Sequence, residues 1–329
     1  MDAGTDRSTN DQVEASWLVL VERLQSGEPC AIVQAADLLG GPAALDRALR
    51  QLSVLGLPLA VDERLGELRW RRDSGALDAV GIAEAAALSG WSCPVEVLAL
   101  TDSTSTRLAA QPTGSLPRAL LAECQWAGRG RRGRQWLAGY GEAILMSVRV
   151  RVARPPAQHP GLALAAGCAV AETLAPLMLR APTLKWPNDL LVGEAKLGGL
   201  LVEAAGDGSL VIGLGLNWSL ATATDRQLAR PVASLAPLLA RPATRSDLAG
   251  RVLAALLAAS EQFDVEGLAA FLARFAALDA LAGRRVIVES ASGVRAGLAC
   301  GLARDGALQV DHEGGLVAYH SAEVTLAWR

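Results

Sequence analysis

The chain has 329 residues, a hydrophobic content of 51% and a formal net charge of −3. The length predicts two or three domains, and the charge excludes a general attraction of the whole chain to nucleic acid or to an acidic membrane. The polar segment 1–12 is not typical of a signal peptide, and Glu172 and Pro176 interrupt the longest apolar run, which indicates a buried helix rather than a membrane span. Five scattered cysteines and three histidines lack metal-site spacing, so we expect free thiols and a cytoplasmic protein.

Residues 1–80 are predicted to form a small helical module. Segments 17–24, 32–39 and 43–55 have apolar residues at helical spacing, and 61–71 alternates around a glycine like a hairpin. Three helices and a hairpin resemble a winged helix-turn-helix, in which the third helix would enter a DNA major groove.

The charge of this module argues against tight DNA binding. It contains 8 Arg against 13 Asp and Glu, a net charge of −5, and only Arg47 and Arg50 are basic on the third helix. DNA affinity comes mostly from neutralised phosphates. A weak repressor domain, a partner-binding domain and a remnant all remain open as interpretations.

Residues 81–279 are predicted to form a central α+β domain in which helices lie beside a mixed, largely antiparallel sheet. A helix is expected after capping-type residues in the segment 101–108. The other expected elements are strands at 95–100, 118–124 and 143–150, a helix at 161–180, a hairpin of 197–204 and 209–216, and helices at 245–263 and 265–278.

Residues 280–329 change in character. Short apolar segments are separated by glycine-containing turns, which favours a small β-barrel of the SH3 type. The expected strands are 286–288, 295–302, 307–310, 316–319 and 324–326.

Two segments of the central domain are unusually rich in groups that bind anions. Lys185 and Lys196 are the only lysines among 31 basic residues, and they lie close to the Asn188–Asp189 pair. Lysine is a compact point charge that suits a phosphate or a reacting carboxylate, although a drift of surface lysine to arginine is the plainer explanation. The loop 128–134 has four Arg and three Gly, which suits an anion-binding loop or a disordered RNA-binding segment.

Neither a P-loop nor a Gly-x-Ser-x-Gly motif is present. The remaining polar groups suit a nucleoside triphosphate with Mg²⁺. They are the two lysines, the arginines, Asp189 and the amides of Gln125, Asn188 and Asn217. We therefore expect chemistry at phosphorus.

Five motifs carry a resemblance to a known family. They are Asp102–Ser105, Gln125–Trp136, Lys185–Asp189, Lys196–Glu203 and Gly213–Asn217. In order and spacing they resemble the biotin–protein ligases, and the three-part layout resembles the bifunctional bacterial type, which also represses biotin synthesis. The main competitors are a lipoate-type ligase and a nucleic-acid-binding regulator for which biotin is only an effector.

The resemblance implies an enzyme with a central fold like the class II synthetases. Biotin and ATP would give biotinyl-AMP, and the biotinyl group would pass to a lysine of the biotin carboxyl carrier protein of acetyl-CoA carboxylase. A homodimer and operator DNA are further implied partners, and an exposed edge strand could pair with a second copy or with the carrier.

The resemblance also implies residue roles, with Mg²⁺ arriving on ATP rather than at a fixed metal site. The catalytic residues would be Lys196, Arg131 and Lys185. Biotin would be bound by Ser103, Thr104, Ser105, Gln125, Arg129, Gly130, Arg131 and Lys196, and ATP by Arg132, Arg134, Lys185, Asn188, Asp189 and Asn217. Trp136 and Trp186 are expected to pack, while Ser105 and Trp126 depart from the family's usual residues and are expected to alter biotin affinity.

Overall fold

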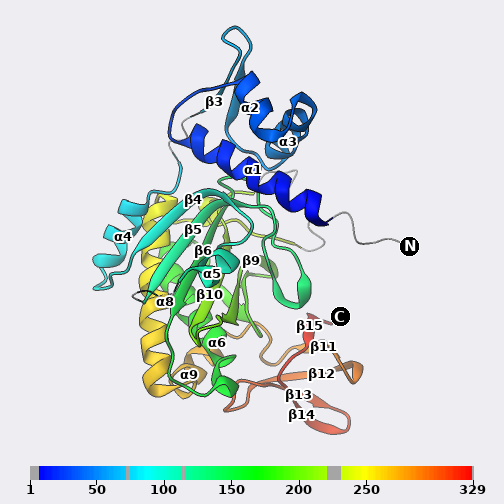
Figure 1. Ribbon diagram of the computed structural model, residues 1–329. Helices are drawn as coiled ribbons and strands as arrows, with labels where there is room; N and C mark the ends of the chain where they lie inside the picture. The colour runs from blue at the N-terminus through cyan, green and yellow to red at the C-terminus, as the bar shows by residue number, and fades with distance from the viewer. Residues whose placement is uncertain (1–6, 72–74, 113, 115, 221–230, 328–329) are drawn as a thin grey trace.

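The computed structural model describes all residues except 1–6, 72–74, 113, 115, 221–230 and 328–329. It contains a small N-terminal helical module, a central seven-stranded sheet flanked by helices, and a C-terminal antiparallel sheet (Figure 1). The α+β fold class is therefore confirmed. Within the described residues, no helix combines the length and the apolar character needed to cross a membrane.

The N-terminal module has the three helices and the hairpin that the sequence predicts. Gly40 ends the second helix in the left-handed region at φ 89°, and Pro42 begins the third, as expected for these residues at helix termini. A two-residue strand adds a third member to the hairpin. The elements are α1 (Arg7–Gln25), β1 (Cys30–Ala31), α2 (Ile32–Leu39), α3 (Pro42–Val54), β2 (Leu59–Asp62) and β3 (Glu67–Trp70).

The central sheet has the strand order β4-β5-β6-β10-β9-β8-β7, in which β4 and β5 are parallel and every other pair is antiparallel. The sequence predicted β4, β5 and β6 together with the β9–β10 hairpin, but not β7 and β8. The strands are β4 (Val95–Thr101), β5 (Arg118–Gln125), β6 (Ala143–Val150), β7 (Thr183–Lys185), β8 (Asp189–Val192), β9 (Ala195–Ala204) and β10 (Leu210–Asn217).

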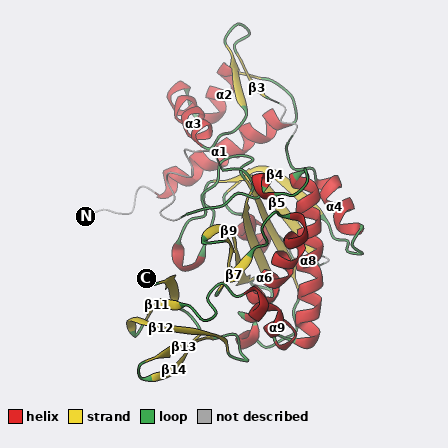
Figure 2. Cartoon of the chain, turned by 180° about the vertical axis from the view of Figure 1, so that it is seen from behind, coloured by secondary structure: helices red, strands yellow, loops and turns green. Residues whose placement is uncertain are grey.

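Helices cover both faces of this sheet. Ala119 and Leu121 of β5 pack in the main core with the long helices, whereas Leu120 points the opposite way and packs against Leu108 of α5. Figure 2 shows α6, α8 and α9 together on one side. The helices are α4 (Ala79–Ala87), α5 (Thr104–Ala110), α6 (Gly161–Leu174), α8 (Arg245–Glu266) and α9 (Ala269–Leu278).

Two helix predictions need correction, and one helix was missed. The helix expected over 161–180 ends at Leu174 and is followed by a short 3-10 turn that contains Pro176, because proline cannot continue the hydrogen-bond ladder. The last two helices separate at Gly267, with φ 75°, and not at Asp264. Helix α4 was not predicted, although Asp78 caps it by accepting from two backbone N–H groups.

The C-terminal sheet has the five predicted strands, in the order β14-β13-β12-β11-β15. A buried hydrogen bond joins it to the central domain, in which Trp186 Nε1 donates to the carbonyl oxygen of Gly306 at 2.9 Å. Trp186 thus packs, as expected. The strands are β11 (Arg285–Ser290), β12 (Gly293–Leu302), β13 (Leu308–His312), β14 (Gly315–Tyr319) and β15 (Glu323–Leu326).

The N-terminal module contacts the central sheet through an apolar cluster. Trp17 and Leu52 of the module share this cluster with Leu100 and Cys124 of the sheet. The backbone N–H of Tyr140, in the segment that follows the Gly/Arg loop, donates to Leu55 O at 2.7 Å. The module therefore rests on the strand ends that precede the candidate site.

Candidate active site

One cavity collects almost every site residue that the sequence predicted. It lies where the end of β5, the Gly/Arg loop, the β7–β8 turn and the strands β9 and β10 meet, and β15 of the C-terminal sheet closes one side. The predicted residues that line it are Ser103, Thr104, Ser105, Gln125, Arg129, Gly130, Arg131, Arg132, Arg134, Lys185, Asn188, Asp189 and Lys196.

Asn217 is the predicted site residue that does not line the cavity. It is 4% exposed, and its Nδ2 donates to the carbonyl oxygens of Lys196 and Ala233, each at 3.1 Å. Since the backbone N–H of Lys196 also donates to Pro231 O at 2.9 Å, the backbone at Lys196 is held from both sides. Asn217 thus supports the lysine.

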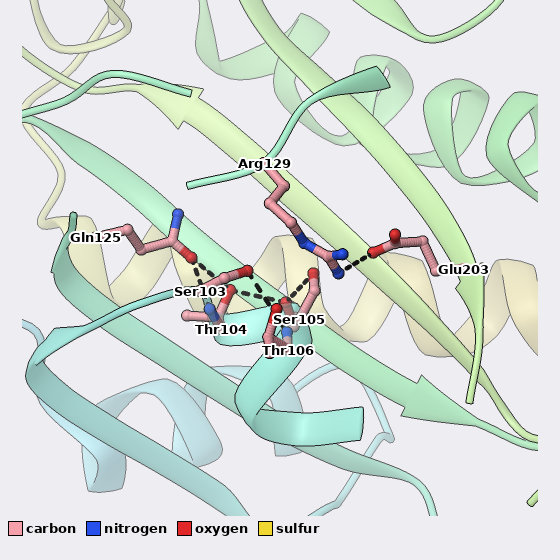
Figure 3. Close-up of polar contacts among 8 residues, drawn as sticks. Ser103, Thr104, Ser105, Thr106, Gln125, Arg129 and Glu203 are labelled. Carbon is pink, nitrogen blue, oxygen red and sulfur yellow. Dashed lines mark hydrogen bonds and ion pairs between the residues drawn. The ribbon is translucent and has the colours of Figure 1, made fainter. Parts of the chain in front are cut away.

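Hydroxyl and amide groups form one end of the cavity. Ser103 caps α5, and Thr104 in its first turn donates to Gln125 Oε1 from its backbone N–H at 2.6 Å and from its hydroxyl at 3.1 Å. Figure 3 shows the nitrogen of the Gln125 amide turned away from Thr104. Thr104 and Ser105 are 4% and 7% exposed, so water competes weakly for this polar end.

The Gly/Arg loop covers the cavity and is attached at both ends by ion pairs. Arg129 lies 2.5 Å from Glu203 of β9, and Arg134 pairs with Glu323 of β15. Between them, Arg132 has φ 56°, in the left-handed region that non-glycine residues seldom occupy. The loop is therefore tied to both the central and the C-terminal sheets.

Cations crowd one another inside this loop. Burial lowers the pKa of Arg131, and the neighbouring charges of Arg132 and Arg134 lower it further, while the carboxylate of Asp189 acts in the opposite direction. Like charges in a partly buried site favour an anion that neutralises them. The arrangement suits a phosphate-bearing ligand.

A lysine and a carboxylate form a second group in the cavity lining, called here the lysine end. Lys196 is 9% exposed, and its Nζ lies 2.5 Å from Asp189 Oδ1 and 5.4 Å from the centre of the Trp136 ring. The backbone N–H of Asn188 donates to Lys185 O at 3.2 Å, which forms the turn between β7 and β8. An ammonium beside a carboxylate can bind an anion and a metal-bound phosphate side by side.

Sequence reasoning did not assign Trp136, Trp186 or Glu323 to the site, although all three line the cavity. Trp136 was expected only to pack, yet it lines the cavity, and its indole lies so close to β10 that a Cβ on Gly215 would approach it to 2.5 Å. The Gly-x-Gly spacing 213–215 was the available signal. Glu323 gave no local signal, because its place in the cavity depends on how the C-terminal sheet docks.

The amino-acid sequence of this chain is similar to those of known proteins. Residues 97–217 match the model of the biotin/lipoate A/B protein ligase family. The bifunctional ligase/repressor BirA of Escherichia coli strain K12 is 30% identical over 94% of this chain and 96% of its own length. The biotin–[acetyl-CoA-carboxylase] ligase of Mycobacterium tuberculosis is 40% identical over 50% of this chain and 63% of its own.

A solved structure extends the match to three dimensions. The biotin protein ligase from Aquifex aeolicus, in complex with biotin and ATP, aligns with a TM-score of 0.63 and 26% identity over 71% of this chain and 98% of that one. This structural match agrees with the sequence similarity to BirA of Escherichia coli, which extends over 94% of this chain. The chain belongs to the biotin–protein ligases of the biotin/lipoate A/B protein ligase family.

Proposed function

We propose that this chain is an ATP-dependent biotin–protein ligase that acts on the biotin carboxyl carrier protein of acetyl-CoA carboxylase. In the first step the carboxylate of biotin attacks the α-phosphorus of ATP, giving biotinyl-5′-AMP and pyrophosphate. In the second, the amine of a carrier lysine attacks the mixed anhydride, forming an amide and releasing AMP. The observation that carries the proposal is a single cavity with a hydroxyl–amide end, a lysine end and an arginine loop above both.

The hydroxyl–amide end is assigned to the ureido ring of biotin. Ser103, Thr104, Ser105 and Gln125 supply its polar groups, and the loop segment 129–131 covers the ring and the valeryl chain. Trp136 provides an apolar wall beside the valeryl chain of biotin. An edge of hydrogen-bonding groups followed by an apolar wall fits a ligand with a polar head and an aliphatic tail.

The lysine end is assigned to the reacting anions. Lys196 binds the biotin carboxylate and the α-phosphate, and Lys185, Asn188, Arg132 and Arg134 bind the ATP phosphates. Asp189 suits the Mg²⁺ that arrives with ATP, because that ion takes one or two protein carboxylates beside phosphate oxygens. Asn217 acts through the backbone of Lys196.

The site works by positioning and charge stabilisation and uses no covalent nucleophile. No cysteine is among the described residues that line the cavity, and burial raises the pKa of Cys124, directly before Gln125, to about 12, so this thiol stays neutral. Holding the carboxylate against the α-phosphorus converts a bimolecular encounter into a local one, and the lysines stabilise charge that develops in the transition state.

One experiment tests the activity directly. The purified chain is mixed with ATP, Mg²⁺ and either biotin or lipoate, and bound adenylates are identified by mass spectrometry. We expect biotinyl-AMP and no lipoyl-AMP. Lipoyl-AMP would move the chain to the lipoate-type ligases, and the absence of both adenylates would refute the proposal.

Arg131 is proposed to hold the lid closed over the adenylate. Arg131→Ala should release biotinyl-AMP into solution, because a loop that closes over an intermediate also retains it. The measurement is the fraction of adenylate that leaves the enzyme in a rapid-quench trap. Arg107→Ala, on helix α5 outside the cavity lining, is the matched control. Equal retention by both variants would contradict the role.

The three-part division stays a proposal, with a winged-helix-like module over 1–80, a catalytic domain over 81–279 and an SH3-like domain over 280–329. DNA binding by the first part receives little electrostatic support. Arg50 on α3 lies 3.9 Å from Asp46, so part of the scarce basic charge is already offset. A low-salt gel shift with biotin-operon DNA, with and without biotinyl-AMP, decides whether this ligase also represses.

A further inference from the structure

A chain of hydroxyl groups lies beneath the polar end of the cavity. Ser147 of β6 is 0% exposed and does not line the cavity. Its Oγ lies 2.7 Å from Thr104 Oγ1 and 2.9 Å from Ser105 Oγ. On the paired strand β10, a Cβ at Gly213 would lie 2.6 Å from Ser105 Oγ, so glycine there leaves room for this arrangement.

The direction of each hydrogen bond among these hydroxyl groups follows from the number of protons that each group carries. The backbone N–H of Thr104 donates to the side-chain amide of Gln125 at 2.6 Å, which identifies the accepting atom as Oε1. The Thr104 hydroxyl, 3.1 Å from the same oxygen, must also donate to it. A hydroxyl has one proton. Thr104 therefore accepts from Ser147, and Ser147 in turn accepts from Ser105.

These donor directions determine which ligand groups Thr104 and Ser105 can bind. The protons of Thr104 and Ser105 are both committed inside the protein, so toward the ligand these side chains offer only lone pairs. They can accept from a ligand N–H, and they repel a ligand oxygen that has no proton. The ureido ring of biotin carries two N–H groups.

We infer that Ser147 is a positioning residue that makes Thr104 and Ser105 act only as acceptors, so that the pocket selects the N–H groups of a cyclic urea. The inference rests on the proposed function and deepens it. Ser147 does not touch the ligand. It acts by taking the proton of Ser105 and giving its own to Thr104.

The test uses biotin and its two cyclic carbamate analogues, each with one ureido N–H replaced by a ring oxygen. Dissociation constants are measured by titration calorimetry. We expect the unchanged chain to bind at least one carbamate about 100-fold more weakly than biotin, because a lone pair would face a lone pair. In Ser147→Ala the Ser105 proton is free to meet the ring oxygen, and the preference for biotin should fall about tenfold.

The matched control separates this effect from a general loosening of the pocket. In a Ser105→Ala background there is no proton to release, so adding Ser147→Ala should leave the preference unchanged. A preference that does not fall in the single variant, or that falls equally in the Ser105→Ala background, would overturn the inference. Should the alanine variant not fold, Ser147→Cys replaces it, since a thiol fills the space and is a weaker donor. Failure of the unchanged chain to bind biotin would refute the proposed function itself.

Discussion

Lys196→Met is expected to lower the rate of biotinyl-AMP formation by about 10³-fold, to the limit of detection. The side chain keeps its length and apolar stem but loses the ammonium that lies 2.5 Å from Asp189 Oδ1. Without this charge, the negative charge that develops between the carboxylate and the α-phosphate has no buried partner. The measurement is biotin-dependent exchange of labelled pyrophosphate into ATP.

A second replacement of a cation by methionine controls for loss of charge in general. Arg284→Met removes the exposed partner of Glu194, outside the cavity lining, and should leave the exchange rate within about twofold. Both variants are also compared by thermal unfolding, so that a folding defect is not mistaken for a chemical one. Near-normal exchange by a folded Lys196→Met chain would remove Lys196 from the mechanism.

Arg245→Met is expected to lower the free energy of unfolding by about 3–5 kcal/mol. Arg245 of α8 lies 2.7 Å from Glu123 of β5, and the two side chains are 4% and 2% exposed. Arg245 also donates to Gly75 O, and the backbone N–H of Leu77 donates to Glu123. Removing the guanidinium would leave a buried carboxylate without its cation, two residues before Gln125. Urea denaturation measures the loss.

The same helix provides the control. Arg251 pairs with Asp247 at 3.1 Å, but their side chains are 47% and 38% exposed, so Arg251→Met should change stability by less than about 1 kcal/mol. Glu123→Leu combined with Arg245→Met should recover much of the loss, because an apolar pair leaves no unpaired charge. Similar losses for Arg245→Met and Arg251→Met would show that the buried pair has no special role.

The sequence predicts those parts of the fold that local signals specify. Helices in the first eighty residues are bounded by glycine and proline, and the structure confirms them. Strands β7 and β8 were missed because they have three and four residues and surround Pro187, so neither shows a period. Helix α4 was missed although Asp78 is a typical N-cap residue.

The residues of the candidate site also fall into two groups, those that local sequence motifs predict and those that they do not. Residues in short motifs, such as Gln125 and Lys196, were predicted from their types and spacing, and both line the cavity. Ser147 and Glu323 were not found, because each acquires its role only through segments distant in the chain. Asn217 was predicted to bind ATP but does not line the cavity, and its hydrogen bond to the backbone of Lys196 could not be read from the sequence.

The pairing of Arg134 with Glu323 has a consequence for how the enzyme matures. During synthesis the loop leaves the ribosome long before β15, which lies far downstream. A nascent chain therefore carries this loop with the Glu203 attachment in its sequence but without Glu323, the second carboxylate that fastens it. The ion pair between the loop and the C-terminal sheet can form only after β15 has joined that sheet.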